Sequence, residues 1–166
     1  MSSTLRQAVI RLAAAKPSLR AHLIPLVAKN AGYARVDPKV KAHPAVQAFL
    51  HALERHASKI EVYLEKMAEE SAEEDFKSGE LSFSSGLEKL DIVGTEILDN
   101  AVHHSDDASL GYDAADTILA DGLAHSWKQA REMVNAIGLD WLTRFDDDVD
   151  AAYAEYIGRE DERRHR

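Results

Sequence analysis

Apolar residues recur at three- and four-residue spacing along most of this chain, which is the period of an α-helix. The longest run lies between Pro44 and Phe76, where one face stays apolar over about six turns in a register close to a heptad. Its residues are Val46, Phe49, Leu50, Leu53, Ala57, Ile60, Leu64 and Met67. Strand-like alternation is confined to Leu81-Ser82-Phe83, which is too short to count. The pattern predicts an all-α fold with short connections, typical of a helix bundle.

Prolines, caps and glycines divide this pattern into an N-terminal hairpin and about four later helices. Pro17 suits the first turn of a second helix and residues 30–32 suit its end, so residues 1–34 are predicted to form an αα-hairpin. The Asp37-Pro38 and His43-Pro44 pairs are predicted helix starts. Long helices are predicted over 44–76, 85–102 and 112–137, the last of them ending before Gly138. A final helix is predicted from a cap at Asp140 to Gly158. Gly94 costs about 1 kcal/mol of helix propensity, and we expect a close helix crossing there.

Charge divides the chain at nearly the same place. Residues 1–45 contain eight Lys or Arg and the single acid Asp37, which gives +7, so the net charge of −9 leaves −16 for the rest. Such asymmetry suggests a segment that binds something negative. We therefore expect a basic amphipathic docking arm over 1–34, an acidic helical bundle over 35–158 and a charged tail over 159–166.

Several classes of chemistry have no sequence support. The chain has no cysteine, which removes disulfides, thiolate metal sites and cysteine nucleophiles. It contains no Gly-x-Ser-x-Gly, no Ser-x-x-Lys and no glycine-rich phosphate loop. No apolar run approaches the roughly 20 residues of a membrane span. The sequence therefore predicts no catalytic residue, no cofactor and no membrane partner, and we expect a protein that is not an enzyme.

The carboxylates and histidines are the candidate metal ligands of this chain. A di-iron bundle carries a Glu-x-x-His motif on each of two helices, and this chain lacks that pair of motifs. The nearest substitute is Glu96, Asp99 and His103, which one helix face can bring together. The acids that follow Asp146 fail the calcium-loop pattern, which needs Gly at its sixth place and Glu at its twelfth. We predict no metal site, and the incomplete motif favours an ordinary solvated surface over a metal site for the three candidates.

The basic hairpin offers the clearest binding surface. Such a surface can bind a phosphate backbone, an anionic membrane or an acidic protein, or can pack on the protein's own body. Residues 1–34 contain no Trp or Phe, which disfavours a membrane as the partner, and the strongly acidic body disfavours nucleic acid. The expected partner-binding residues are Arg6, Arg11, Arg20 and Lys29 for polar contacts, with Leu5, Val9, Leu12, Leu23 and Leu26 for the apolar face.

One segment of this hairpin resembles a known leader. The residues 5–13, Leu-Arg-Gln-Ala-Val-Ile-Arg-Leu-Ala, followed by Pro17-Ser18-Leu19-Arg20 and Leu23-Ile24-Pro25-Leu26, are similar to an N-terminal segment shared by tailed-bacteriophage proteins, virion structural proteins among them. The resemblance covers about residues 5–27, and the body from Val36 onward resembles no family. It implies a virion-associated or assembly protein whose leader is a docking or head-targeting element.

These observations favour a non-enzymatic structural or assembly protein of a tailed bacteriophage. Its expected partners are other protein subunits, such as capsid or tail proteins, or further copies of itself, and its expected location is the virion or the host bacterial cytoplasm. Two alternatives stay open: a helical-bundle metal-dependent enzyme that uses Glu96, Asp99 and His103, and a nucleic-acid-binding regulator that uses the basic hairpin.

Overall fold

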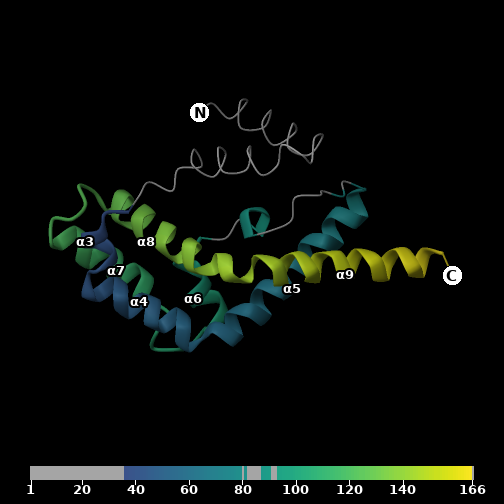
Figure 1. Ribbon diagram of the computed structural model, residues 1–166, viewed down its shortest axis with the longest axis horizontal. Helices are drawn as coiled ribbons and strands as arrows, with labels where there is room; N and C mark the ends of the chain where they lie inside the picture. Colours follow the sequence, from purple (N-terminus) through teal and green to yellow (C-terminus); the bar gives the residue numbers. More distant parts are fainter. Residues whose placement is uncertain (1–35, 80, 82–86, 91–92, 166) are drawn as a thin grey trace, which may run out of the picture. The chain divides into compact units, whose positions relative to one another are not determined.

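The computed structural model describes residues 36–79, 81, 87–90 and 93–165, and all regular structure in them is helical, which confirms the all-α prediction (Figure 1). The residues from Asp37 onward form one compact unit. None of the helices in this described part is long and apolar enough to cross a membrane. The elements are α3 (Pro38–Lys41), α4 (Pro44–Arg55), α5 (Ala57–Ser78), the 3₁₀ turn η2 (Leu87–Leu90), α6 (Glu96–Ala101), α7 (Leu110–Ala120), α8 (Trp127–Leu142), the 3₁₀ turn η3 (Thr143–Phe145) and α9 (Asp146–Arg164).

The first two described helices begin where local chemistry predicts. The Asp37 carboxylate accepts a hydrogen bond from the Lys39 N–H, and Pro38 occupies the first turn of α3. His43 caps α4 in the same way, because its Nδ1 accepts the Ala45 N–H at 3.2 Å ahead of Pro44. Both starts were predicted from the sequence, and both are confirmed.

Two predicted helices are each interrupted. The segment predicted as one helix over 44–76 changes direction at His56, whose backbone (φ −105°, ψ 13°) separates α4 from α5. The helix predicted over 112–137 ends at Ala120, because Gly122 adopts a left-handed φ of +73°. Hydrogen bonds from the Gly122 N–H to the Leu119 carbonyl and from the Leu123 N–H to the Ile118 carbonyl complete a glycine C-cap. The apolar period continues on both sides of each break, and it therefore does not reveal them.

Three other predicted boundaries were wrong. The segment predicted as a helix over 85–102 contains the short turn η2 and the separate helix α6. Helix α8 continues through Gly138 to Leu142, so Asp140 lies inside a helix and does not cap one. Helix α9 begins at Asp146 and continues past Gly158 to Arg164, which makes most of the predicted charged tail helical.

The core lies where α4, α7 and α8 pack together, with α6 beside them. Helix α4 contributes Phe49 and Leu53, and both side chains are fully buried. The other large side chains that are fully buried in this part of the unit are Val46, Ile97, Leu98, Ile118, Val134 and Leu142. Burying a side chain of this size stabilises the fold by about 1.5–3 kcal/mol before entropy is counted. The apolar stripes predicted from the sequence therefore do form the core.

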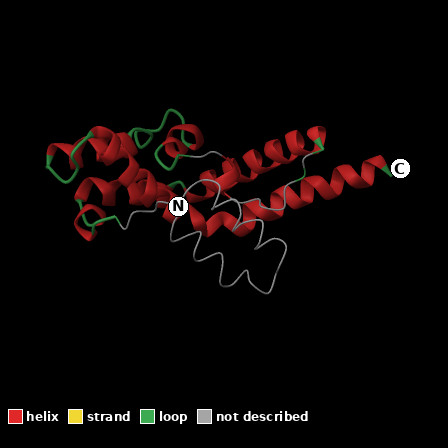
Figure 2. Cartoon of the chain, turned by 90° about the horizontal axis from the view of Figure 1, so that it is seen from above, coloured by secondary structure: helices red, strands yellow, loops and turns green. Residues whose placement is uncertain are grey.

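Helices α5 and α9 form a second feature, a pair of long helices that runs past this core (Figures 1 and 2). Glu54, just before α5, binds Arg144, just before α9, while the Arg164 guanidinium at the end of α9 lies 3.9 Å from the ring centroid of Phe76 near the end of α5. The two helices therefore run in the same direction. We call this pair, residues 57–78 and 146–164, the α5–α9 pair.

Candidate functional site

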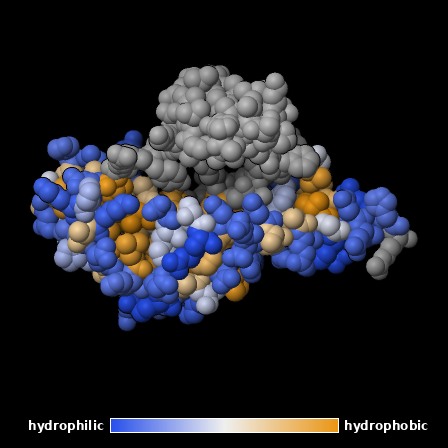
Figure 3. Space-filling model, in the orientation of Figure 1, coloured by the Kyte–Doolittle hydropathy of each residue, from blue (hydrophilic) through white to orange (hydrophobic). Residues whose placement is uncertain are grey.

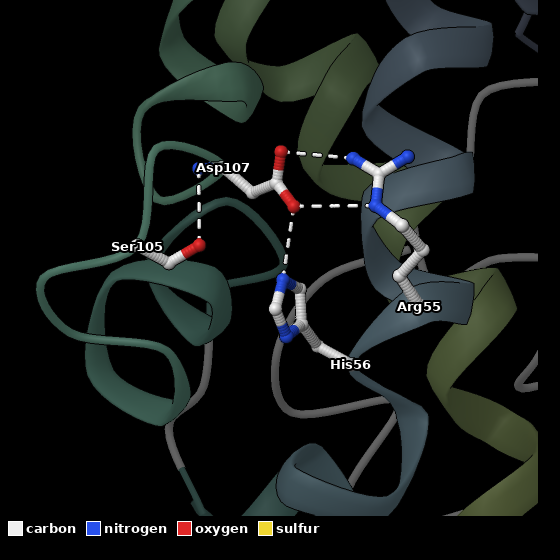
Figure 4. Close-up of polar contacts among 4 residues, drawn as sticks. All are labelled: Arg55, His56, Ser105 and Asp107. Carbon is white, nitrogen blue, oxygen red and sulfur yellow. Dashed lines mark hydrogen bonds and ion pairs between the residues drawn. The ribbon is translucent and has the colours of Figure 1, made fainter.

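Asp107 joins the loop before α7 to the junction between α4 and α5 (Figure 4). Its Oδ1 accepts from Arg55 Nη2 at 2.8 Å, and its Oδ2 accepts from Arg55 Nε at 3.3 Å and from His56 Nε2 at 2.9 Å. The backbone N–H of Asp107 donates to Ser105 Oγ at 3.2 Å. The Arg55 and His56 hydrogen bonds lower the pKa of the Asp107 carboxyl. Both oxygens are thus occupied, and the group suits holding the His56 break in place better than proton transfer.

Glu54 ties the same junction to the end of α8. Its carboxylate accepts from Arg144 Nη1 at 3.0 and 3.2 Å and from Trp141 Nε1 at 3.1 Å. The Arg144 guanidinium also lies 4.4 Å from the centroid of the Trp141 ring. The hydrogen bond from Arg144, followed by that from Trp141, lowers the pKa of Glu54. Glu54 and Asp107 therefore fix both sides of the α4–α5 junction, from which the α5–α9 pair extends.

A third cluster lies at the start of α8 and differs from these two because an aromatic face stays accessible. We call it the Trp127 cluster: Tyr112, Asp116, Trp127 and Arg131. Trp127 is 41% exposed, and its Nε1 donates to Asp116 Oδ1 at 2.6 Å. The Arg131 guanidinium lies 5.5 Å from the Trp127 ring centroid and 5.3 Å from that of Tyr112, within the range of cation–π attraction. These contacts hold the exposed ring in one orientation.

The residue types in this cluster are the ones that dominate protein–protein binding energy. Trp, Tyr and Arg are enriched at the centres of interfaces. The sequence pattern predicts one continuous helix over 112–137 that includes Trp127, and this prediction was wrong because a new helix begins at Trp127 after the break at Gly122. The four-residue spacing of Trp127 and Arg131 is the one signal by which the cluster could have been found.

The predicted metal candidates do not converge. Glu96 is bound by Arg131, whose Nη2 lies 2.5 Å from Glu96 Oε1, while Asp99 and His103 are exposed. The His103 ring instead lies against the ring of His104, with centroids 3.8 Å apart. Within the residues that the structure describes, no group of three His, Asp or Glu side chains could hold a metal ion.

The predicted partner-binding residues all lie outside the described residues, as does the predicted hairpin over 1–34. Arg6, Arg11, Arg20, Lys29, Leu5, Val9, Leu12, Leu23 and Leu26 therefore remain predictions.

The basic side chains of the described part are largely paired with its own carboxylates. Ion pairs connect different helices at Arg131–Glu96, Arg144–Glu54 and Arg159–Glu69, while Lys66–Glu70, Lys77–Glu73 and Lys128–Glu132 form within single helices. Residues 1–35 carry six Lys or Arg and no acid, so the net charge of −9 leaves −15 on residues 36–166. The face seen in Figure 3 is correspondingly hydrophilic over most of the described residues. The acidic excess therefore has no neutralising partner within residues 36–166.

Comparison with protein-family models, with curated proteins and with solved structures gave no match.

Proposed function

We propose that the protein is a non-enzymatic structural or assembly protein, associated with the virion of a tailed bacteriophage, and that it docks on other protein subunits through residues 1–34. The virion association is supported by the resemblance of residues 5–27 to a leader segment of phage proteins.

The division of charge along the chain is the observation that carries this proposal. The part from Asp37 onward is a compact unit with its own core, and the acids of residues 36–166 exceed the bases by fifteen. All six basic residues before residue 36 precede that unit in the sequence. A basic segment suits an acidic partner, because opposite charge steers two surfaces together.

The metal-dependent enzyme gains no support from the candidate residues. Arg131 binds Glu96, and a metal ion would have to displace that guanidinium before the carboxylate could act as a ligand. The nucleic-acid regulator depends on the same basic segment as the proposal, and the salt dependence of binding to DNA separates the two.

The test compares the full-length chain with residues 35–166, each produced in the bacterial host during infection. Particles are purified on a density gradient and the chain is quantified in them. The full-length chain should band with the particles, while residues 35–166 should keep a helical circular dichroism spectrum and stay in the unbound fraction. The proposal fails if the full-length chain is absent from particles, or if the truncated chain bands equally well.

A charge variant with a matched control makes the test specific. Replacing Arg6, Arg11, Arg20 and Lys29 with Gln should remove the chain from particles. The control replaces four exposed basic residues of the described part with Gln, namely Lys39, Lys41, Lys59 and Lys128, and should leave incorporation unchanged. Equal loss in both variants would show that overall charge, and not the N-terminal segment, governs incorporation. Retention of DNA by the full-length chain at low salt, without incorporation into particles, would favour the regulator instead.

A further inference from the structure

We infer that copies of this chain associate head to tail, with residues 1–35 of one copy bound to the Trp127 cluster and the exposed face of α7 on the next copy. The inference rests on the proposed function, because it names a second copy as one of the subunits on which the basic segment docks.

The receiving surface has a rigid aromatic centre. Asp116 holds the Trp127 indole by its N–H, and Arg131 lies against the rings of both Trp127 and Tyr112. Glu96 in turn binds Arg131 at 2.5 Å. An exposed ring that is already ordered loses little conformational entropy when a partner covers it. The apolar stripe of residues 1–35, which includes Leu5, Val9 and Leu12, is the chemistry that covers an aromatic ring.

The exposed face of α7 adds the matching charge. Asp113, Asp116, Thr117 and Ala120 are exposed at helical spacing along it, and α7 contains no Lys or Arg. Asp113 and Asp116 are the carboxylates of α7 with which basic residues of the segment, such as Arg6 and Arg11, would pair.

Charge also explains why copies meet head to tail. A twofold contact between two described units would place one −15 surface against another, which is unfavourable. A head-to-tail contact places six basic residues of one copy on the acidic surface of the next. Such a contact uses different surfaces on the two copies, so it either closes into a ring, of which a dimer that exchanges both segments is the smallest, or continues as a filament.

The first experiment titrates a synthetic peptide of residues 1–35 into residues 36–166, a unit with its own core. The protein carries Trp141→Phe, which leaves Trp127 as its one tryptophan. The peptide should shift the Trp127 emission saturably, and affinity should fall as salt rises, because exposed charges are screened. Absence of a saturable shift overturns the inference.

Matched variants locate the binding surface. Asp113→Asn combined with Asp116→Asn should weaken peptide binding about three- to tenfold, as expected for two exposed charge contacts. Asp150→Asn combined with Glu155→Gln removes the same charge from exposed positions of α9 and should leave affinity within about twofold. Equal weakening by both pairs would mean that the peptide senses net charge only, which overturns the proposed surface.

The role of Trp127 is tested by attaching a dye to the peptide and following the fluorescence of that dye as the protein is added. Trp127→Ala should weaken binding by about thirtyfold or more if the ring is the centre of the interface. Trp127→Phe keeps an aromatic ring and should lose less, which separates loss of binding from loss of the fold. Equal affinity of both variants and the parent would exclude the cluster.

The mass of the full-length chain, measured by light scattering after gel filtration, decides where the segment binds. Oligomers whose mass grows with concentration, and which need a higher concentration to form with Asp113→Asn and Asp116→Asn, support the inference. A monomer at every concentration that nevertheless binds the peptide weakly would mean that the segment occupies its own copy, which overturns it. In that case the particle experiment can still succeed, so failure here is distinguishable from failure of the proposed function.

Discussion

Gly94 and Gly138 meet backbone to backbone where the segment before α6 crosses α8. A Cβ on Gly94 would lie 2.7 Å from the Asn135 carbonyl oxygen, 3.0 Å from the Leu139 nitrogen and 3.1 Å from the Gly138 Cα. These are backbone atoms of a helix, which cannot move aside as a flexible side chain would. The close approach expected at Gly94 is therefore present, but Gly94 precedes α6 and does not lie within a helix, so the expected crossing of two helices was wrong.

Gly94→Ala should consequently destabilise the protein by about 1–3 kcal/mol, the usual range for overpacking. Urea unfolding followed by circular dichroism measures the change in the free energy of unfolding. The control is Gly158→Ala in α9, where nothing lies within 4 Å of the added Cβ and helix propensity should stabilise the fold by up to about 1 kcal/mol. A neutral Gly94→Ala would show that the crossing is looser than these distances indicate.

The parts of the fold that could be read from the sequence depend on neighbours in the chain. Asp37-Pro38 and His43-Pro44 mark helix starts because a cap and its N–H partner lie two residues apart. The break at His56 could not be read, since its ring binds Asp107, 51 residues later, and the apolar stripe continues through it. The Gly122 break did carry a local signal, an Asp-Gly pair after an apolar helix, but the helical pattern that resumes beyond it masked the signal.

The candidate site shows the same division. Trp127 and Arg131 stand four residues apart on one helix, a spacing visible in the sequence. Tyr112 comes from α7 and Glu96 from α6, and only the packing of three helices brings them to Arg131. Exposure of Trp127 was likewise beyond the sequence, because a large apolar ring at helical spacing is normally part of a core.

Asp107 predicts a pH-dependent contribution to stability. Its pKa in the folded protein lies below the ordinary value of 3.8, so its stabilising effect is complete above that value and is lost as the pH falls through the folded pKa. Asp107→Asn should therefore lower the free energy of unfolding at neutral pH, and the difference from the parent should shrink in acid. Urea unfolding of both proteins across an acid series measures this difference. Asp106→Asn, at an exposed neighbour, serves as the control, and a difference that grows in acid would contradict the assignment.

Ala72 on helix α5 is fully buried, and Ala68, one turn earlier on the same face, is 1% exposed. Small residues let helices α5 and α9 approach closely, and the larger side chain of Ala72→Leu should separate them at a cost of about 1–3 kcal/mol. Thermal and urea unfolding measure the loss. Ala154→Leu, exposed on α9, adds the same atoms to the surface and should change stability by less than about 0.5 kcal/mol. Equal effects of the two substitutions would mean that α5 and α9 do not rely on close packing at Ala72.

Gly122 ends α7 with a φ of +73°, and no atom lies within 4 Å of the position that a Cβ would take. Any cost of a side chain there is therefore backbone strain and not a clash. Gly122→Ala should destabilise the protein by about 1–2 kcal/mol, the cost of the left-handed conformation for an ordinary residue. Gly122→Asn should cost less, because asparagine tolerates this conformation better. The free energy of unfolding, measured in urea, should be highest for glycine, lower for asparagine and lowest for alanine at this position if Gly122 is a C-cap. An alanine variant as stable as the parent would instead mean that α7 and α8 can join into the continuous helix that their apolar pattern suggests.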